Sequence, residues 1–175
     1  MNDELLKFSK IFLNIILDLL IIIISILLIL GLYSLYQTKI NKKLYTNYFG
    51  YTLLNTETGS MEDTIKINDF VLVKLDAKYD ENDIITYQTD NALVTHRLIE
   101  IRNEYLVTKG DNNNTIDEPI MKEQVLGRVV KILPRIGIYI KVVKEPIVLA
   151  PLCILIILVV LLLKDKEVKK NEKKE

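Results

Sequence analysis

The sequence predicts a mainly β protein in which a small barrel-like domain is flanked by transmembrane helices at both ends. Three observations support this prediction. Hydrophobic residues make up 50% of the 175 residues, and the apolar excess is concentrated in two blocks near the termini. The segment between these blocks is polar and contains short β-rich runs separated by turn residues. Both terminal blocks approach the length of about 20 apolar residues that a bilayer span needs.

The composition excludes several classes of site. The 23 basic and 23 acidic residues balance, so the broad basic surface of a nucleic-acid-binding protein is not expected. One histidine and one cysteine cannot assemble a zinc finger or a multi-histidine metal site, and they cannot form a disulfide within the chain. We therefore expect no metal and no cofactor. The chemistry must use hydroxyls, carboxylates, lysines or the single imidazole.

Residues 1–36 are expected to form an N-terminal helical segment at the membrane. Leu19 to Tyr36 is mostly apolar and could cross a bilayer by itself. Residues 5–17 carry a polar stripe at helical spacing, followed by Asp18, which indicates an interfacial lead-in helix. One longer tilted span, with Asp18 near its cytoplasmic end, is the alternative. A cleavable signal peptide is a third interpretation, although no small-residue cleavage site follows the apolar stretch.

The C-terminal apolar block predicts a second transmembrane helix at residues 146–163. This run contains no charged residue, and both of its prolines fall in its first turns, where a missing backbone N–H is tolerated. Lysines are more numerous in the charged tail at 164–175 than before the span, so the C-terminus is expected in the cytoplasm. With two spans, both termini are cytoplasmic, and residues 37–145 form an extracytoplasmic β-rich domain of a multi-pass cell-membrane protein.

Residues 37–145 have the pattern of a small all-β domain. Short runs rich in β-branched and aromatic residues alternate with Asn, Asp and Gly positions that favour turns. The segment is long enough for a barrel-like or sandwich core, and no internal repeat is visible. One short helix is indicated at 118–127. The expected strands are at 70–75, 83–89, 92–101, 105–110 and 127–133, with a further β-rich run at 51–54.

The lone histidine, His96, lies in the longest of these runs. Alternation places it on the same face as Val94 and Leu98, so the imidazole points with the apolar side chains. A buried imidazole must have its nitrogens bonded or be used in chemistry. By itself, this position is compatible with a structural histidine as well as with a catalytic one.

Two polar segments accompany the histidine. Gly59 directly precedes Ser60 in an otherwise glycine-poor chain, and a glycine there lets another backbone come close to the serine. Residues 109–117 form a polar stretch that contains Asp111 and Asp117. Each segment alone is also compatible with an ordinary surface turn.

In chain order, TGSM at 58–61, THR at 95–97 and TKGDNN at 108–113 with a later aspartate resemble signal peptidase I of the Ser-His type. This branch comprises the endoplasmic reticulum, archaeal and SipW-like enzymes. The resemblance covers roughly residues 52–133, and the ordered set of motifs is far more specific than any one of them. It implies a small β-barrel-like catalytic domain of the signal peptidase and LexA type.

The resemblance also implies a role for each matching residue. Ser60 corresponds to the nucleophile and His96 to the general base, whereas Asp117 corresponds to the carboxylate that orients the histidine. Asp111 corresponds to a second acidic position that supports the site. Thr58 corresponds to a hydroxyl that joins the backbone N–H of Ser60 in the oxyanion hole. Nucleophilic attack by serine at neutral pH requires a base beside the hydroxyl and a carboxylate on the other ring nitrogen of that base.

The chain departs from the family pattern at a few positions. Thr58 replaces the usual serine but keeps the hydroxyl. Asn68 and Asn82 stand where glycine is common, and asparagine tolerates left-handed backbone. Asp63 stands where proline is usual, and the loss of proline is expected to leave the loop after Ser60 less rigid.

The implied function is that of a membrane-bound serine endopeptidase, which removes signal peptides from secretory precursors after small residues. The precursor would bind extended along a strand edge. The expected partners are these precursors, the lipid bilayer and the secretion translocon, and not nucleic acid. Two alternatives remain. A non-catalytic, membrane-tethered β-domain would act as a partner in surface assembly, and a self-cleaving Ser-Lys enzyme would use Lys74 or Lys109 as its base.

Overall fold

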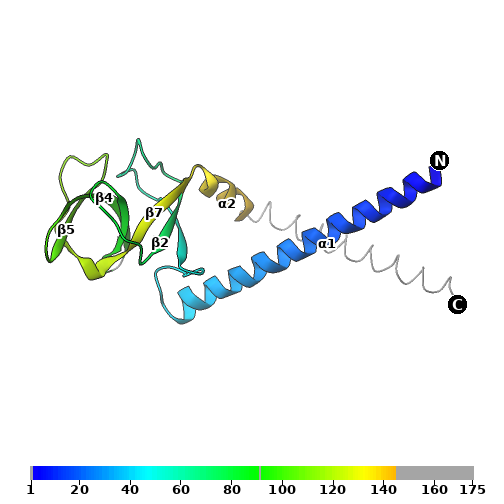
Figure 1. Cartoon of the computed structure of the whole chain (residues 1–175), viewed down its shortest axis with the longest axis horizontal. Helices are drawn as coiled ribbons and strands as arrows, with labels where there is room; N and C mark the ends of the chain where they lie inside the picture. The colour runs from blue at the N-terminus through cyan, green and yellow to red at the C-terminus, as the bar shows by residue number, and fades with distance from the viewer. Residues whose placement is uncertain (1, 91, 145–175) are drawn as a thin grey trace.

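The computed structural model of the chain describes residues 2–90 and 92–144. The C-terminal span expected at 146–163 and the tail expected at 164–175 lie outside the described residues. Within the described part, a long helix precedes a β-domain and a short helix follows it (Figure 1). The elements are α1 (Asn2–Leu35), a π-helical turn (Tyr36–Ile40), β1 (Tyr51–Asn55), β2 (Phe70–Leu75), β3 (Ile84–Gln88), β4 (Leu93–Ile101), β5 (Tyr105–Lys109), β6 (Ile120–Met121), a 3₁₀ turn (Lys122–Gln124), β7 (Val125–Leu133) and α2 (Ile136–Lys144).

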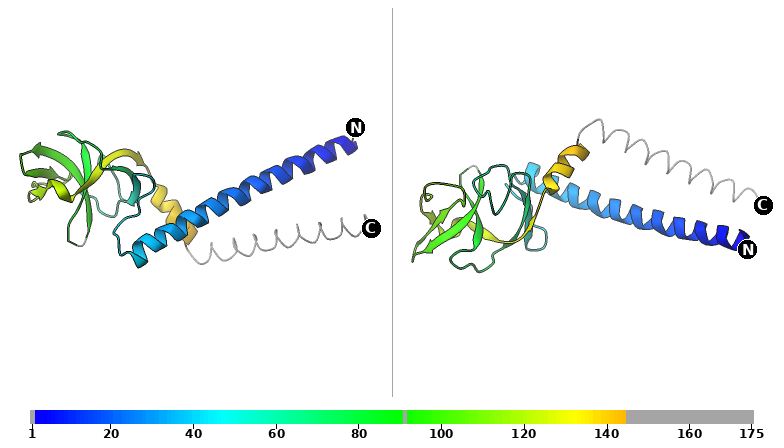
Figure 2. Two further views of the ribbon diagram at one scale, coloured as in Figure 1. Left: turned by 60° about the horizontal axis from the view of Figure 1, so that its bottom comes forward. Right: turned by 90° about the horizontal axis from the view of Figure 1, so that it is seen from above.

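Helix α1 is continuous, and its N-terminal end points away from the β-domain (Figures 1 and 2). No proline interrupts it, and the polar residues in its first half are compatible with a helix. Residues 5–17 belong to this helix and do not form a separate lead-in helix. The N-terminal segment is therefore one long helix. The stretch from Asn14 to Ile40 is long and apolar enough to cross a membrane, and the rest of the described chain does not bury it.

The described strands form one antiparallel sheet of seven strands, in the order β1-β2-β7-β3-β4-β5-β6. Register shifts interrupt the pairing of β7 with both β2 and β3, and that of β4 with β5. Such bulges bend a strand and increase its local twist. The sheet accordingly curls into a half-barrel (Figure 2), which confirms the prediction of a mainly β, barrel-like domain at this level.

The five expected strands all form, with shifts of one or two residues at their ends. The prediction of a short helix at 118–127 is wrong. That segment contains β6, a single 3₁₀ turn and the start of β7. Pro119 disfavours helix in the residue before it, and the β-branched Ile120 and Val125 favour extended backbone.

Helix α2 has no counterpart among the expected elements. Its residues are mostly β-branched, which by propensity favours a strand. A turn at Arg135 starts the helix, with a φ of 61°, and the backbone N–H of Arg135 donates to the buried Asp69 carboxylate at 2.8 Å. The N–H of Gly137 donates to the C=O of Asn68 at 2.9 Å. Tertiary contacts at its first turn therefore override the local preference of the segment.

The core consists of two buried clusters. One lies among β3, β4, β5 and β6, and the other lies between β2 and the loop that follows β1. Because this loop carries Ser60, its burial bears directly on the site. The first cluster contains Ile85, Tyr87, Leu98, Leu106 and Ile120, and the second contains Met61, Ile65, Val71 and Val73.

Three positions that depart from the family pattern have left-handed backbone. Asn68 and Asn82 have φ values of 68° and 74°, which confirms that asparagine takes the conformation that glycine would otherwise supply. Asp63 has a φ of 81°. Proline fixes φ near −65° and could not adopt this backbone. The turn after Ser60 therefore has a different backbone conformation at residue 63 from a turn that contains proline there.

Candidate active site

Ser60 lies between β1 and β2, at the start of a tight turn. The backbone N–H groups of Ile65 and Thr64 both donate to the C=O of Met61, at 2.8 and 3.1 Å. The side chains of Met61 and Ile65 are only 2% and 1% exposed, and both pack in the second core cluster. Because its neighbour is held in the core, Ser60 is presented at the domain surface in a defined position.

The segment at 110–112 holds the other side of the serine. The backbone N–H of Asn112 donates to the C=O of Ser60 at 2.9 Å, and the Asn112 side-chain amide donates to the C=O of Gly59 at 3.1 Å. A Cβ at Gly110 would lie 2.6 Å from the Ser60 carbonyl oxygen, closer than two non-bonded atoms can come. Two segments that are distant in sequence thus pack backbone against backbone, and glycine at 110 allows it.

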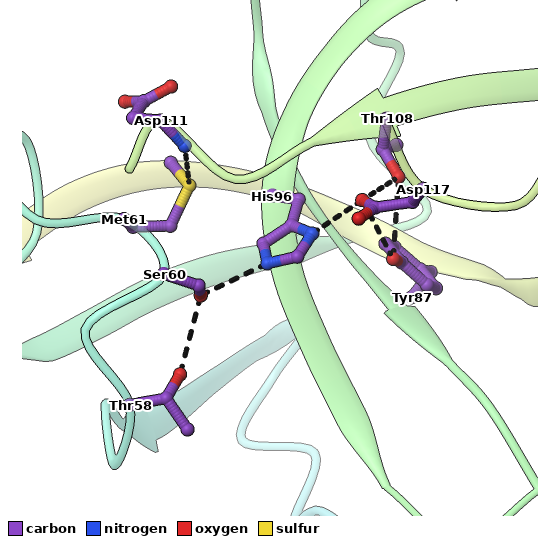
Figure 3. Close-up of polar contacts among 8 residues, drawn as sticks. All are labelled: Thr58, Ser60, Met61, Tyr87, His96, Thr108, Asp111 and Asp117. Carbon is purple, nitrogen blue, oxygen red and sulfur yellow. Dashed lines mark hydrogen bonds and ion pairs between the residues drawn. The ribbon is translucent and has the colours of Figure 1, made fainter. Parts of the chain in front are cut away.

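His96 extends from β4 toward the serine (Figure 3). The residue is 7% exposed and shares the buried face of the strand with Leu98, as alternation predicts. Its Nε2 lies 3.0 Å from Ser60 Oγ. His96 is paired with Ile85 of β3, so the hydrogen bonds of the sheet fix the place from which the ring extends.

Asp117 contacts the other side of the imidazole. Its backbone N–H donates to the C=O of Thr108 at 2.9 Å, which brings the loop back against β5. Oδ2 of Asp117 lies 2.5 Å from His96 Nδ1 and accepts a hydrogen bond from the Thr108 hydroxyl at 2.8 Å. With Asp117 ionised, Nδ1 carries the hydrogen, and Nε2 is left to accept from Ser60.

The hydroxyl of Tyr87 is a third donor to the same carboxylate oxygen. It lies 3.5 Å from Asp117 Oδ2 and 3.3 Å from the hydroxyl oxygen of Thr108 (Figure 3). Burial raises the pKa of the Tyr87 hydroxyl above its ordinary value, so the group stays protonated and able to donate. Tyr87 and Thr108 therefore restrict the carboxylate to the orientation that meets the imidazole.

Thr58 approaches the serine from a different direction than His96 (Figure 3). Its Oγ1 lies 3.3 Å from Ser60 Oγ. This hydroxyl and the backbone N–H of Ser60 belong to the same short loop, beside the oxygen that would attack a substrate. The position is compatible with a donor to a developing oxyanion, as the sequence predicts.

Asp111 belongs to a second network, next to the first. It accepts from Arg97 in a bidentate pair, with Nε to Oδ1 at 2.8 Å and Nη2 to Oδ2 at 2.6 Å. The Thr64 hydroxyl donates to Oδ2 at 2.5 Å. The hydrogen bond from Arg97 holds the pKa of the Asp111 carboxyl below its ordinary value, and Asp111 in turn raises the pKa of Arg97.

Arg97 is the neighbour of His96 in β4, and by alternation it points to the opposite face. Besides Asp111, it donates to the C=O of Asn82 at 2.8 Å and to the Thr64 hydroxyl at 3.4 Å. The guanidinium therefore links β4, the turn after Ser60 and the 110–112 segment. Asp111 supports the site through these loops, whereas Asp117 contacts the histidine.

The geometry agrees with a comparison of the sequence with known families. A family model described as Peptidase S24-like matches residues 33–130, which is more than half of the chain. The chain belongs to the peptidase S24-like family. The matched region contains Ser60, His96 and Asp117, together with β1 to β6 and the first part of β7.

This member of the S24-like family is also similar to signal peptidase I W of Bacillus subtilis (strain 168). The two sequences are 41% identical over 86 residues, which cover 44% of this chain and 45% of that protein. The match thus spans just under half the length of the relative. The resemblance to a SipW-like signal peptidase I, which the motifs indicate, is confirmed by this match.

A groove of about 760 Å³ runs past the candidate site. Among the described residues, β1 pairs with β2 and, at Tyr51 alone, with Tyr48, and β4 pairs with β5 only from Arg97 onward. The outer edge of β1 beyond Tyr51 and that of the first part of β4 are thus unpaired beside the groove. Its lining includes Leu54, Asn55, Thr58, Ser60, Leu93, Val94, Thr95 and His96. Unpaired strand edges can bind an extended peptide through main-chain hydrogen bonds.

Several residues that hold the site could not be assigned a role from the sequence. Arg97, Thr108 and Asn112 lie inside the quoted motifs, but their contacts depend on loops that meet only in the folded chain. The signal for Tyr87 is its spacing from Ile85, which places it on the buried face of β3, the strand paired with β4. A buried tyrosine needs a partner for its hydroxyl, and the neighbouring strand carries the histidine.

Proposed function

We propose that this chain is a membrane-bound serine endopeptidase of the signal peptidase I type, which removes signal peptides from secretory precursors after small residues. The observation that supports the proposal most strongly is the hydrogen-bonded series Ser60, His96 and Asp117, with contacts of 3.0 and 2.5 Å. Membership of the peptidase S24-like family and the similarity to a protein named signal peptidase I W agree with it.

Each member of the series has a role in this mechanism. Ser60 Oγ attacks the scissile carbonyl while His96 Nε2 takes its proton, and the imidazolium later protonates the leaving amine. Asp117 stabilises that imidazolium and keeps the hydrogen of the neutral ring on Nδ1. The backbone N–H of Ser60 and the Thr58 hydroxyl donate to the oxyanion, and the loss of one such donor costs about 10²- to 10³-fold in rate.

The contacts of Ser60 favour histidine over lysine as the base. Its hydroxyl bonds to His96, whereas Lys74 lies on β2 and Lys109 is paired with Arg97 at the end of β5. We therefore do not retain the Ser-Lys alternative. A purely structural histidine is also disfavoured, because the second ring nitrogen faces a serine in an open groove rather than another core group.

The proposed substrate is a precursor that shares the membrane with the enzyme. Helix α1 supports membrane anchoring through its long apolar stretch. Confinement of enzyme and precursor to one bilayer raises the effective concentration of the cleavage site. We further propose the two-span topology, with residues 37–145 outside and both termini in the cytoplasm, and the secretion translocon as a partner.

The proposal is tested by cleavage of a secretory precursor in liposomes that contain the full chain. The expected product is the mature protein, with a new N-terminus directly after a small residue, as read by N-terminal sequencing. A precursor in which that residue is replaced by a large one should resist cleavage. The function is wrong if no precursor is cut, or if the cut positions bear no relation to small residues.

The pair of Asp111 with Arg97 predicts a pH-dependent contribution to stability. Because Arg97 lowers the pKa of Asp111 in the folded chain, the contribution is fully present above the ordinary aspartate pKa of about 3.9. It is lost as the pH falls through the lowered folded pKa. In thermal unfolding, Asp111→Asn should lower the Tm at pH 7, and the difference from the wild type should shrink in acid. A difference of the same size at pH 3 and pH 7 would contradict this role, and Asp90→Asn, at an exposed acid, serves as the control.

A further inference from the structure

The segment that connects α1 to β1 runs back along the helix instead of leading away from it. The hydroxyls of Ser34 and Thr46 are 3.0 Å apart, and the Tyr48 hydroxyl donates to the C=O of Leu30 at 3.4 Å. The rings of Tyr33 and Tyr48 also contact, with centroids 6.0 Å apart. Figure 1 shows this segment turning back toward the helix. The turn at residues 47–50 therefore lies level with Leu30, not with the end of the helical segment.

This level falls inside a bilayer that α1 crosses. The apolar stretch Asn14–Ile40 has 27 residues, which at 1.5 Å per residue is about 40 Å, longer than a hydrocarbon core of about 30 Å. Leu30 lies about 24 Å from Asn14 on the same scale. A core placed at the Asn14 end of the stretch has the level of Leu30 about 6 Å inside its surface, and a core shifted toward Ile40 buries that level more deeply.

The turn at this level exposes a phenylalanine on strained backbone. Phe49 is 96% exposed and has a φ of 55°, a conformation that residues with a bulky side chain rarely adopt. The turn is nevertheless well held. Tyr48 and Tyr51 exchange backbone hydrogen bonds of 2.7 and 3.1 Å, and the N–H of Gly50 donates to the Asn47 side chain at 2.8 Å. In water, exposure of the benzyl side chain of Phe49 contributes no stabilising free energy.

The surroundings of Phe49 have the chemistry of a bilayer interface. An apolar hollow of about 540 Å³ lies between the turn and α1, lined from the helix by Ile29, Leu30 and Tyr33. Its apolar lining suits a lipid acyl chain. Exposed lysines, which attract anionic headgroups, follow in the chain toward the end of the helical segment. These are Lys39, Lys42 and Lys43.

We propose that the turn at residues 47–50 is a second membrane contact, in which Phe49 inserts beside α1 into a bilayer that contains anionic phospholipid. Two attachments fix the tilt of the β-domain, which one helix alone would leave free to pivot. Strand β1 begins at Tyr51, directly after the turn, and its five residues extend about 17 Å toward the loop of Ser60. The contact therefore sets the height of the groove above the membrane. The inference requires that α1 crosses the bilayer, and it does not depend on peptidase activity.

The test uses the absence of tryptophan from the sequence, which has none among its 175 residues. Phe49→Trp places the single tryptophan in the turn, where it can be excited selectively over the nine tyrosines. The full chain is reconstituted in phosphatidylcholine vesicles with and without phosphatidylglycerol. The expected result is blue-shifted emission and strong quenching by lipids brominated on their acyl chains. The matched control is Met121→Trp, at a residue 57% exposed on β6, the sheet edge opposite β1. It should emit as in water and resist these quenchers.

Two outcomes would overturn the proposal. If Phe49→Trp is quenched by aqueous acrylamide as readily as Met121→Trp, and not by brominated lipid, the turn does not enter the bilayer. If the depth and extent of quenching are the same with and without phosphatidylglycerol, the anionic lipid has no part in the contact. Because fluorescence is read without a substrate, failure of the proposed peptidase activity would leave both outcomes readable.

Discussion

Replacement of Ser60 by alanine should reduce precursor cleavage to background while leaving the domain folded. The side chain removed is the oxygen that bonds to His96 Nε2, and no other hydroxyl in the loop has this contact with the imidazole among the described residues. Loss of a triad nucleophile costs about 10⁶-fold in turnover. The measurement is the rate of cleavage of a reconstituted precursor by purified wild type and variant.

The fold of the Ser60→Ala chain is checked by its Tm, which should be close to that of the wild type, because Met61 and Ile65 hold the loop. Ser25→Ala is a matched control. Within the part of the chain that the structure describes, its hydroxyl bonds only inside α1, to the C=O of Ile21, so cleavage should be unaffected. Cleavage by Ser60→Ala at a rate near that of the wild type would rule out Ser60 as the nucleophile.

Replacement of Asp117 by asparagine should have the next largest effect, a loss on the order of 10⁴ in kcat. An amide can donate to Nδ1 of His96, which would place the ring hydrogen on Nε2. In that tautomer, Nε2 has no free lone pair to accept the proton of Ser60, because the lone pair of the neutral ring is then on Nδ1. The contacts with Thr108 and Tyr87 can survive the change, so the loss should appear in turnover more than in stability.

Asp111→Asn is the matched comparison for this prediction. Both acids lie in the same loop, but Asp111 pairs with Arg97 and Thr64 instead of the histidine. Its replacement should lower Tm more than Asp117→Asn does, and it should reduce kcat far less. If the two variants show the opposite ranking, the roles assigned to the two carboxylates are exchanged.

Local patterns predicted most of the sheet. The strand at His96 was predictable because its burial alternates with a period of two, and the observed face agrees. The 118–127 segment and α2 were not predicted well. In the first, the side-chain oxygen of Gln124 accepts from the N–H of Met121 and helps to end β6 in a short turn. In the second, contacts with Asp69 start a helix in a sequence rich in β-branched residues.

The members of the candidate site and the order of their contacts were implied by the family resemblance, whereas the loop contacts that hold them in place were not. Ser60, His96 and the two aspartates follow from the order of the motifs. Which aspartate meets the imidazole depends on how the loop after β5 folds, and the bond from the N–H of Asp117 to the C=O of Thr108 sets that path. The hydrogen bonds of the Arg97 side chain join segments that are far apart in sequence, so no local pattern could reveal them.

The reactivity of a thiol at position 60 tests most directly whether the histidine activates that residue. Cys153 is the one cysteine in the sequence, so Ser60→Cys combined with Cys153→Ala leaves a single thiol. Its alkylation by iodoacetamide is measured as a function of pH, with and without His96→Ala. With His96 present, we expect a thiol that ionises well below the ordinary cysteine pKa of about 8.5, and without His96 a return toward that value. Identical pH profiles for the two chains would contradict the pairing of the nucleophile with the imidazole.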